Sequence, residues 1–289
     1  MSTQAQQNPW ARELDDLMRG ASGGFLFSIP LLYTMEVWWI GTVVSPPRMA
    51  LALLGACAIV FLLTLTGGFR REEQGKFSDA LLETVESVGF SLLFSAAMLA
   101  LLRRVTLSTP LDEAVGTIIY GALPFAVGMA LGNQLLSGAR DEEGEGEGRQ
   151  GDNGADERGA TLKDLGASAI GAVFIAFSIA PTEEIPMLAA ALTPPWLLTM
   201  IAASLLISYM IVFESGFADE AGRHQQRGVL QSPLSETVAS YLVALAASAL
   251  MLVLYDQVRL DDPWPVWLSH TLVLGLPAAV GGAAGRLAV

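Results

Sequence analysis

The chain has 289 residues, of which 52% are apolar and only 16% are charged. An average soluble domain carries about 25% charged residues, so this composition excludes an ordinary soluble domain and favours a membrane protein. The formal net charge is −13, and the sequence has no basic patch to neutralise phosphates, which argues against nucleic acid as a partner.

Eight apolar runs follow one another along the chain. Each is long enough to form a helix that crosses the roughly 30 Å hydrocarbon core of a bilayer, and none shows the alternating pattern of barrel strands. The predicted fold class is therefore all-α, a polytopic transmembrane helical bundle with eight spans. The predicted helices cover residues 21–44, 49–67, 85–104, 113–136, 165–190, 196–214, 235–256 and 266–287.

Two polar segments divide the predicted membrane part into 21–137 and 164–289, with four helices in each. Residues 1–20 are predicted to form a cytoplasmic N-terminal segment. Residues 138–163 are predicted to form an acidic, disordered cytoplasmic linker, because they hold too few apolar residues to pack; a calcium-sensing segment is the alternative. Twelve Lys and Arg residues fall on the side of the termini and four on the other. We therefore expect a bacterial-type inner (plasma) membrane protein with both termini in the cytoplasm.

The two membrane parts are similar in sequence. The stretch "SPPRMALALL" in the first part matches "TPPWLLTMIA" in the second, "LLETVES" matches "LSETVAS", and "GALPFAVGMALG" matches "LGLPAAVGGAAG". We interpret this similarity as the duplication of a four-helix unit. Because four is an even number, the sequence predicts two parallel repeats related by an axis along the membrane normal.

Acidic residues and prolines interrupt the first helix of each predicted repeat, in "FSIPLLYTMEV" and "FSIAPTEEIPML". A carboxylate is costly within a bilayer and is expected to face the bundle interior or water. A proline leaves a backbone carbonyl without its helical hydrogen bond, and such carbonyls are tolerated where they line a cavity. Carbonyl and carboxylate oxygens together suit hard cations or protons. The candidate ion-binding or proton-accepting residues are Glu36, Glu184, Glu183, Thr34 and Thr182, and the predicted helix breaks are at Pro30, Pro181 and Pro186. In the alternative reading, these glutamates cap helix ends or reach the membrane interface.

Two further groups of residues recur in both halves. Glu83 and Glu236 open the third helix of each half, and Glu86 lies one turn after Glu83. These three acids either stabilise helix N-termini through the dipole or form an inner cation ring. A GxxxG spacing predicts close helix packing, between the two halves or between two protomers. The glycines concerned are Gly128, Gly132, Gly281 and Gly285.

Other kinds of chemistry find little support. The chain has two histidines and one cysteine, so neither a zinc or copper site nor any other cofactor is expected. No nucleophile–base pair is evident, and the protein is predicted not to be an enzyme. Leu188 stands where the Glu-Glu-x-x-x-Arg motif of membrane-embedded prenyl-protein endopeptidases requires arginine. The expected partners are the lipid bilayer, inorganic cations and, as a further alternative, a second copy of the chain.

The pattern of spans, the "PP" pairs before the second and sixth helices, and the paired "ETV" sequences resemble a family of bacterial multi-pass integral membrane proteins with no established function. The resemblance implies a membrane protein and supplies no mechanism. From the residues, we predict a cation channel or secondary transporter of the Ca²⁺, Na⁺ or H⁺ class that uses paired intramembrane glutamates. The alternative is a membrane scaffold or regulatory protein without an ion pathway.

Overall fold

The computed structural model describes residues 9–67, 76–142, 156–214 and 233–287, and within these ranges every regular element is a helix. The first group of helices comprises α1 (Pro9–Leu32), α2 (Met35–Val43), α3 (Pro46–Gly67), α4 (Lys76–Leu101) and α5 (Leu111–Glu142). The second group comprises α6 (Asp156–Ile179), α7 (Glu184–Ala191), α8 (Pro194–Tyr209), the short π-helix η3 (Met210–Glu214), α10 (Pro233–Leu254) and α11 (Trp264–Leu287). The all-helical prediction is confirmed.

Within these ranges, six helices are long and apolar enough to cross a membrane. Two bent pairs raise the number to eight if each pair counts as one span: α1 with α2, bent by 84°, and α6 with α7, bent by 93°. The predicted continuous helices 21–44 and 165–190 are therefore wrong in shape. Each is a long helix followed by a short one at nearly a right angle.

Proline and threonine account for the first bend. Pro30 lies in the last turn of α1 and cannot donate a backbone hydrogen bond. Thr34 then takes an extended conformation with ψ of 134°, and its hydroxyl donates to the Leu31 carbonyl at 2.7 Å. At the second bend Thr182 repeats this contact, with its hydroxyl 2.7 Å from the Ile179 carbonyl oxygen. The predicted breaks thus occur next to Pro30 and Pro181, while Pro186 lies inside the first turn of α7.

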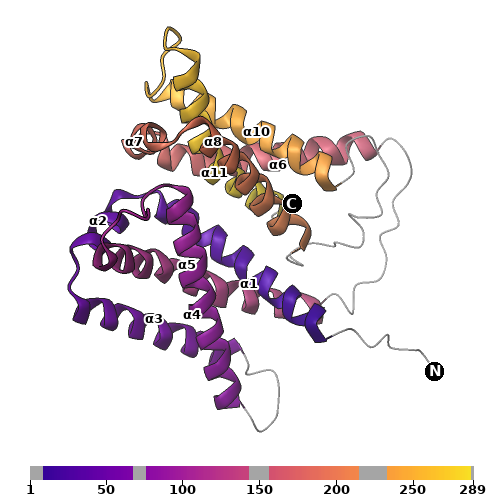
Figure 1. Cartoon of the computed structure of the whole chain (residues 1–289). Coiled ribbons are helices and arrows are strands. Elements are labelled where there is room, and N and C mark those ends of the chain that lie inside the picture. Colours follow the sequence, from indigo (N-terminus) through magenta and orange to yellow (C-terminus); the bar gives the residue numbers. More distant parts are fainter. Residues whose placement is uncertain (1–8, 68–75, 143–155, 215–232, 288–289) are drawn as a thin grey trace.

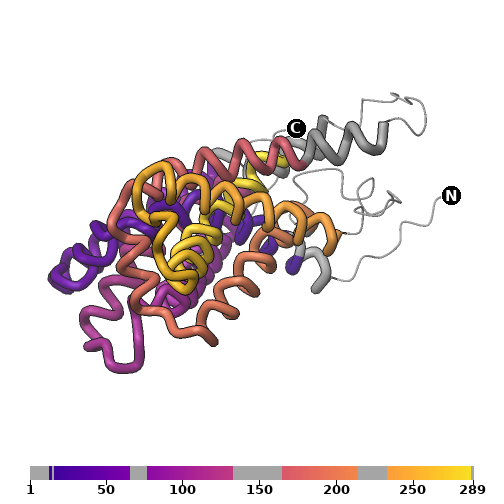
Figure 2. The backbone as a smooth tube through the Cα atoms, turned by 90° about the horizontal axis from the view of Figure 1, so that it is seen from above, coloured from indigo at the N-terminus to yellow at the C-terminus, as the bar shows by residue number. Residues whose placement is uncertain are grey.

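The helices form two groups that lie side by side, with α1–α5 in the lower part of Figure 1 and α6–α11 in the upper part. Each group packs far more extensively within itself than against the other. Viewed from above in Figure 2, the tube of the second group crosses over the first. The contacts that join the groups come mainly from α1, which packs against α11 and η3.

Glycines bring α1 close to α5 in the first group and α6 close to α11 in the second. A Cβ added at Gly23 would meet backbone atoms of Gly128 and Gly132, and one added at Gly171 would meet Gly281 and Gly285. The GxxxG prediction of close packing is confirmed, because only glycine lets two backbones approach this closely. The expected partner was wrong: these glycines join α1 to α5 and α6 to α11 inside each group, and they do not join the groups.

Helices extend into the range predicted as a linker. α5 continues to Glu142 and α6 begins at Asp156, so both ends of the 138–163 segment are helical. The remaining part, 143–155, lies outside the described residues, and so does the N-terminal segment before residue 9.

Candidate functional site

Glu184 is the buried acid at the point where the two helix breaks meet. It is the first residue of α7, and only 8% of it is exposed. Its Oε1 accepts a hydrogen bond at 3.1 Å from the backbone N–H of Met35, which is the first residue of α2. One carboxylate therefore lies at the N-termini of two helices, one from each group, where the helix dipoles favour negative charge.

The other two predicted acids are not buried as Glu184 is. Glu36 and Glu183 are both exposed. Glu36 was expected deep within a continuous helix, but the bend after Leu32 places it in the first turn of α2 instead. The first group contributes the Met35 backbone N–H to Glu184 and leaves the Glu36 side chain exposed, so the convergence of Glu36 and Glu184 as a symmetric pair stays a prediction.

The threonines at the two helix breaks make hydrogen bonds that close the turns. The hydroxyl protons of Thr34 and Thr182 are both donated to carbonyls three residues earlier. The free carbonyl of Leu32 is likewise satisfied, because it accepts the indole N–H of Trp38 at 2.7 Å. Backbone oxygens that the sequence assigned to cation binding are thus used to close the turns, while the hydroxyl oxygens keep lone pairs for a further contact.

Hydrogen bonds also connect the two groups near Glu184. The Tyr33 hydroxyl, on a residue only 1% exposed, donates to the Val273 carbonyl of α11 at 2.9 Å. The Trp196 indole N–H, at the start of α8, donates to the Leu101 carbonyl at the end of α4 at 2.6 Å. Together with the Glu184 bond, they form three polar links across what we call the seam, the boundary between α1–α5 and α6–α11.

A buried ion pair marks the far end of the second group. The Arg286 guanidinium, on a side chain 1% exposed, forms a salt bridge with Glu236, which is 20% exposed. It also donates to the Ser240 hydroxyl at 3.3 Å and lies 5.5 Å from the centre of the Phe213 ring in η3. Glu236 opens α10, and Arg286 lies in the last turn of α11, so the pair joins the ends of these two helices.

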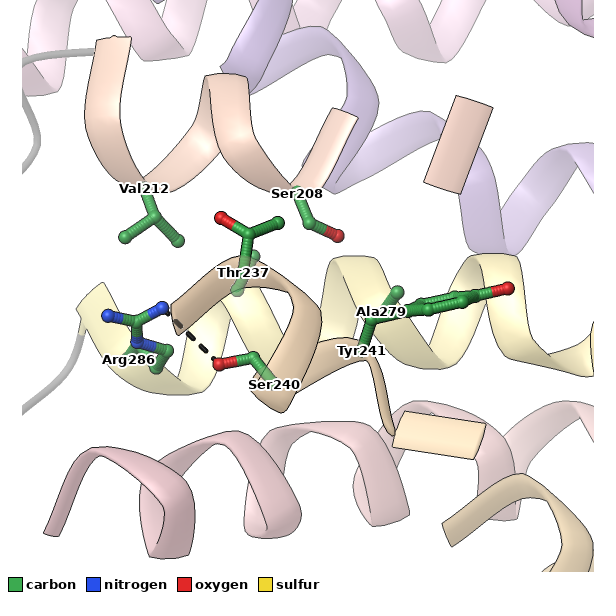
Figure 3. Close-up of a pocket in the computed structure, with 8 residues that line it drawn as sticks. Ser208, Val212, Thr237, Ser240, Tyr241, Ala279 and Arg286 are labelled. Atoms are coloured by element: carbon green, nitrogen blue, oxygen red, sulfur yellow. Dashed lines mark hydrogen bonds between the residues drawn. The ribbon is translucent and has the colours of Figure 1, made fainter. Parts of the chain in front are cut away.

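A small cavity lies beside this ion pair (Figure 3). Its volume of about 10 Å³ suits one water molecule. Its lining comes from α8 and η3 on one side and from α10 and α11 on the other: Ser208, Val212, Thr237, Ser240, Tyr241, Ala279, Ala283 and Arg286. The buried Ser208 hydroxyl has no hydrogen-bond partner among the described residues, and a water here would give it one.

The predicted inner cation ring is not formed. Glu83 and Glu86 are exposed on α4, and Glu83 lies near Asp16, which pairs with Arg19 at 3.3 Å. Glu236 is instead neutralised by Arg286. No cluster of three or more His, Cys, Asp or Glu side chains suited to a metal ion occurs within the described ranges.

The family described as "Putative integral membrane protein (DUF2391)" matches residues 16–289, which include both broken helices, Glu184 and the Glu236–Arg286 pair. The chain belongs to this family. The family has no assigned function, and the membership predicted from the spans is confirmed. The protein is thus an integral membrane protein with several apolar helices. A search of curated proteins and a search of solved structures each found no match.

Sequence reasoning missed Arg286 and Tyr33. Arg286 was counted only as one of the basic residues that flank the last helix, although it follows "GGAAG" in an otherwise apolar helix where a charge is costly. A basic residue at that position is a signal from which a buried charged partner could have been predicted. Tyr33 carries no such signal, because its hydrogen bond goes to a backbone carbonyl 240 residues away.

Proposed function

We propose that this protein is a secondary transporter that exchanges an inorganic cation for protons, with Glu184 as the residue that takes up and releases the proton. The observation that carries the proposal is the buried Glu184 carboxylate, held against the start of α2 across the seam. The chain is proposed to cross the membrane eight times, as two parallel four-helix repeats with both termini in the cytoplasm.

The hydrogen bond to Met35 gives protonation a mechanical consequence. An ionised Glu184 is stabilised by the Met35 N–H and by two helix N-termini. A proton on Glu184 removes the negative charge that these groups favour, so it weakens one of the three polar links across the seam. In this proposal the loss of charge allows the two groups to separate at this end.

The packing of the helices supports movement of this kind. Each group is held together internally by glycine-mediated contact, α1 with α5 and α6 with α11. The contacts between the groups are much less extensive. Two compact units joined by a smaller interface are suited to rigid-body rocking, which is how transporters built from repeats alternate access.

The chemistry at Glu184 favours a proton over Ca²⁺ as the species that this carboxylate binds directly. Ca²⁺ takes six to eight oxygen ligands, whereas Glu184 is the one buried carboxylate among the described residues and Glu36 and Glu183 are exposed. A single carboxylate is sufficient for a proton.

We expect Glu184→Gln to abolish transport while leaving the protein folded. Glutamine keeps the shape of the side chain and can still accept the Met35 hydrogen bond, but it cannot bind and release a proton at ordinary pH. The measurement is proton movement in proteoliposomes, followed with a pH-sensitive dye after addition of Na⁺, K⁺ or Ca²⁺.

Glu183→Gln and Glu36→Gln are the matched controls, because both acids are exposed and one is adjacent to Glu184 in the chain. We expect both variants to transport like the wild type. If wild-type liposomes move no protons with any of these cations, or if Glu184→Gln transports normally, the proposal fails.

The bond between Glu184 and Met35 also favours a second candidate, a membrane scaffold or regulatory protein without an ion pathway. In that case Glu184 serves only to join the two groups. This candidate predicts no flux in any variant, and a greater loss of stability for Glu184→Ala, which removes the acceptor, than for Glu184→Gln, which keeps it.

A further inference from the structure

Two adjacent arginines, Arg103 and Arg104, follow the last turn of α4. Each guanidinium lies over a tryptophan ring: Arg103 is 5.4 Å from the centre of Trp196 of α8, and Arg104 is 4.5 Å from the centre of Trp38 of α2. Both indole N–H groups are already used in hydrogen bonds to backbone carbonyls. The tryptophans are therefore fixed, and they hold two positive charges near each other at one end of the bundle.

Neither arginine has a carboxylate partner among the described residues. Within the part of the chain that the structure describes, no Asp or Glu oxygen lies within ion-pair distance of Arg103 or Arg104. The Arg104 Nε is also buried without a hydrogen-bond partner among these residues. Partial burial lowers the pKa of Arg104 from its ordinary value, and an anion at this place would offset the cost of that desolvation.

The corresponding turn after α10 provides an internal comparison. Arg103 and Asp256 occupy equivalent places after their helices, and both have a φ of 56°, a left-handed conformation that favours glycine. In the second turn the arginine is paired, because the Arg259 guanidinium forms a salt bridge with Asp256 at 3.1 Å and its backbone N–H donates to Asp262 at 2.7 Å. Contact with Arg259 lowers the pKa of Asp256. The first turn differs, because no described Asp or Glu forms an ion pair with Arg103 or Arg104.

We propose that Arg103 and Arg104, backed by Trp196 and Trp38, bind the phosphate of an anionic phospholipid headgroup. Tryptophan is typical of the boundary between hydrocarbon and headgroups, and neighbouring Trp39 and Leu107 are largely exposed, as residues that face lipid would be. Arginine offers the forked donors that suit phosphate oxygens. A lipid with a cationic choline group would be repelled by the second arginine, so the site favours a headgroup of net negative charge.

This inference does not depend on the transport proposal and is tested by lipid binding. The full chain in detergent is titrated with phosphatidylglycerol or phosphatidylcholine, and the bound lipids are counted by native mass spectrometry. The wild type is expected to prefer phosphatidylglycerol. Arg104→Gln is expected to weaken that binding by about tenfold, the size of one lost charge-assisted hydrogen bond.

Two further variants separate lipid binding from folding and from general charge. Arg103→Gly removes a guanidinium while placing glycine at the φ of 56°, so it is expected to lose lipid without losing stability. Arg259→Gln removes a charge that is already paired with Asp256 and is expected to bind lipid normally. The proposal is overturned by unchanged lipid binding in the Arg103→Gly, Arg104→Gln double variant. An equal loss in Arg259→Gln, or displacement of the lipid by excess inorganic phosphate, would also overturn it.

Discussion

Replacing Gly171 by alanine is expected to destabilise the second helix group by about 3 kcal/mol, the upper end of the usual cost of overpacking. The added Cβ would meet the carbonyl oxygen of Gly281, with the Gly281 carbonyl carbon at 2.9 Å and the Gly285 Cα at 3.0 Å. All three are backbone atoms, so no side chain can rotate aside. The helices α6 and α11 would have to separate along their whole contact.

Gly166→Ala is the control for this prediction, since Gly166 lies in the same helix and a Cβ there meets nothing within 4 Å. Alanine is a better helix former than glycine by roughly 1 kcal/mol, so this variant is expected to match or exceed the wild type. The measurement is unfolding in detergent micelles, followed by circular dichroism. If Gly171→Ala proves as stable as Gly166→Ala, the close contact between α6 and α11 is not as described.

The helices were predictable from sequence because long apolar runs have few alternatives in a membrane. The bends were predictable in position but not in angle. Pro30, Pro181 and the two threonines mark where hydrogen bonding within the helix stops. The turn of nearly 90° that follows is fixed by distant partners, such as the Val273 carbonyl that holds Tyr33, and these partners lie outside any local pattern.

The same distinction applies to the candidate site. An acid in an apolar segment predicted that Glu184 would be partnered, because burial of a charge requires a partner, and Glu184 is buried and accepts a hydrogen bond. The sequence placed Glu36 at the equivalent position and so predicted a symmetric pair. In the structure Glu36 is exposed, and its neighbour Met35 supplies the contact through its backbone. Backbone donors carry no residue signature, so the actual partner of Glu184 could not have been identified from sequence.

The glycine motifs show what a spacing can and cannot predict. Gly128 with Gly132, and Gly281 with Gly285, indicated surfaces where another helix comes close. The spacing does not specify the partner, and the partners are Gly23 of α1 and Gly171 of α6. Each belongs to the same group as the motif, so glycine packing holds each group together. The seam is instead closed by buried apolar side chains of one continuous core and by three hydrogen bonds.

Glu236→Gln is expected to destabilise the protein by about 3 kcal/mol, because it removes a carboxylate that forms a salt bridge with the buried Arg286 guanidinium. Ser240 and the Phe213 ring also contact the guanidinium, and both are uncharged. Arg286→Met is expected to cost less. Glu236 is 20% exposed against 1% for Arg286, so the carboxylate left behind can be solvated while the guanidinium cannot.

The double variant Glu236→Gln with Arg286→Met distinguishes this electrostatic explanation from simple loss of packing. If the cost arises from an uncompensated buried charge, removing both partners is expected to recover much of the stability lost in Glu236→Gln alone. Glu83→Gln, at the equivalent but exposed position on α4, serves as the control and is expected to unfold like the wild type in detergent. If the double variant loses as much unfolding free energy as the two single variants together, the pair contributes through packing. The electrostatic explanation would then be wrong.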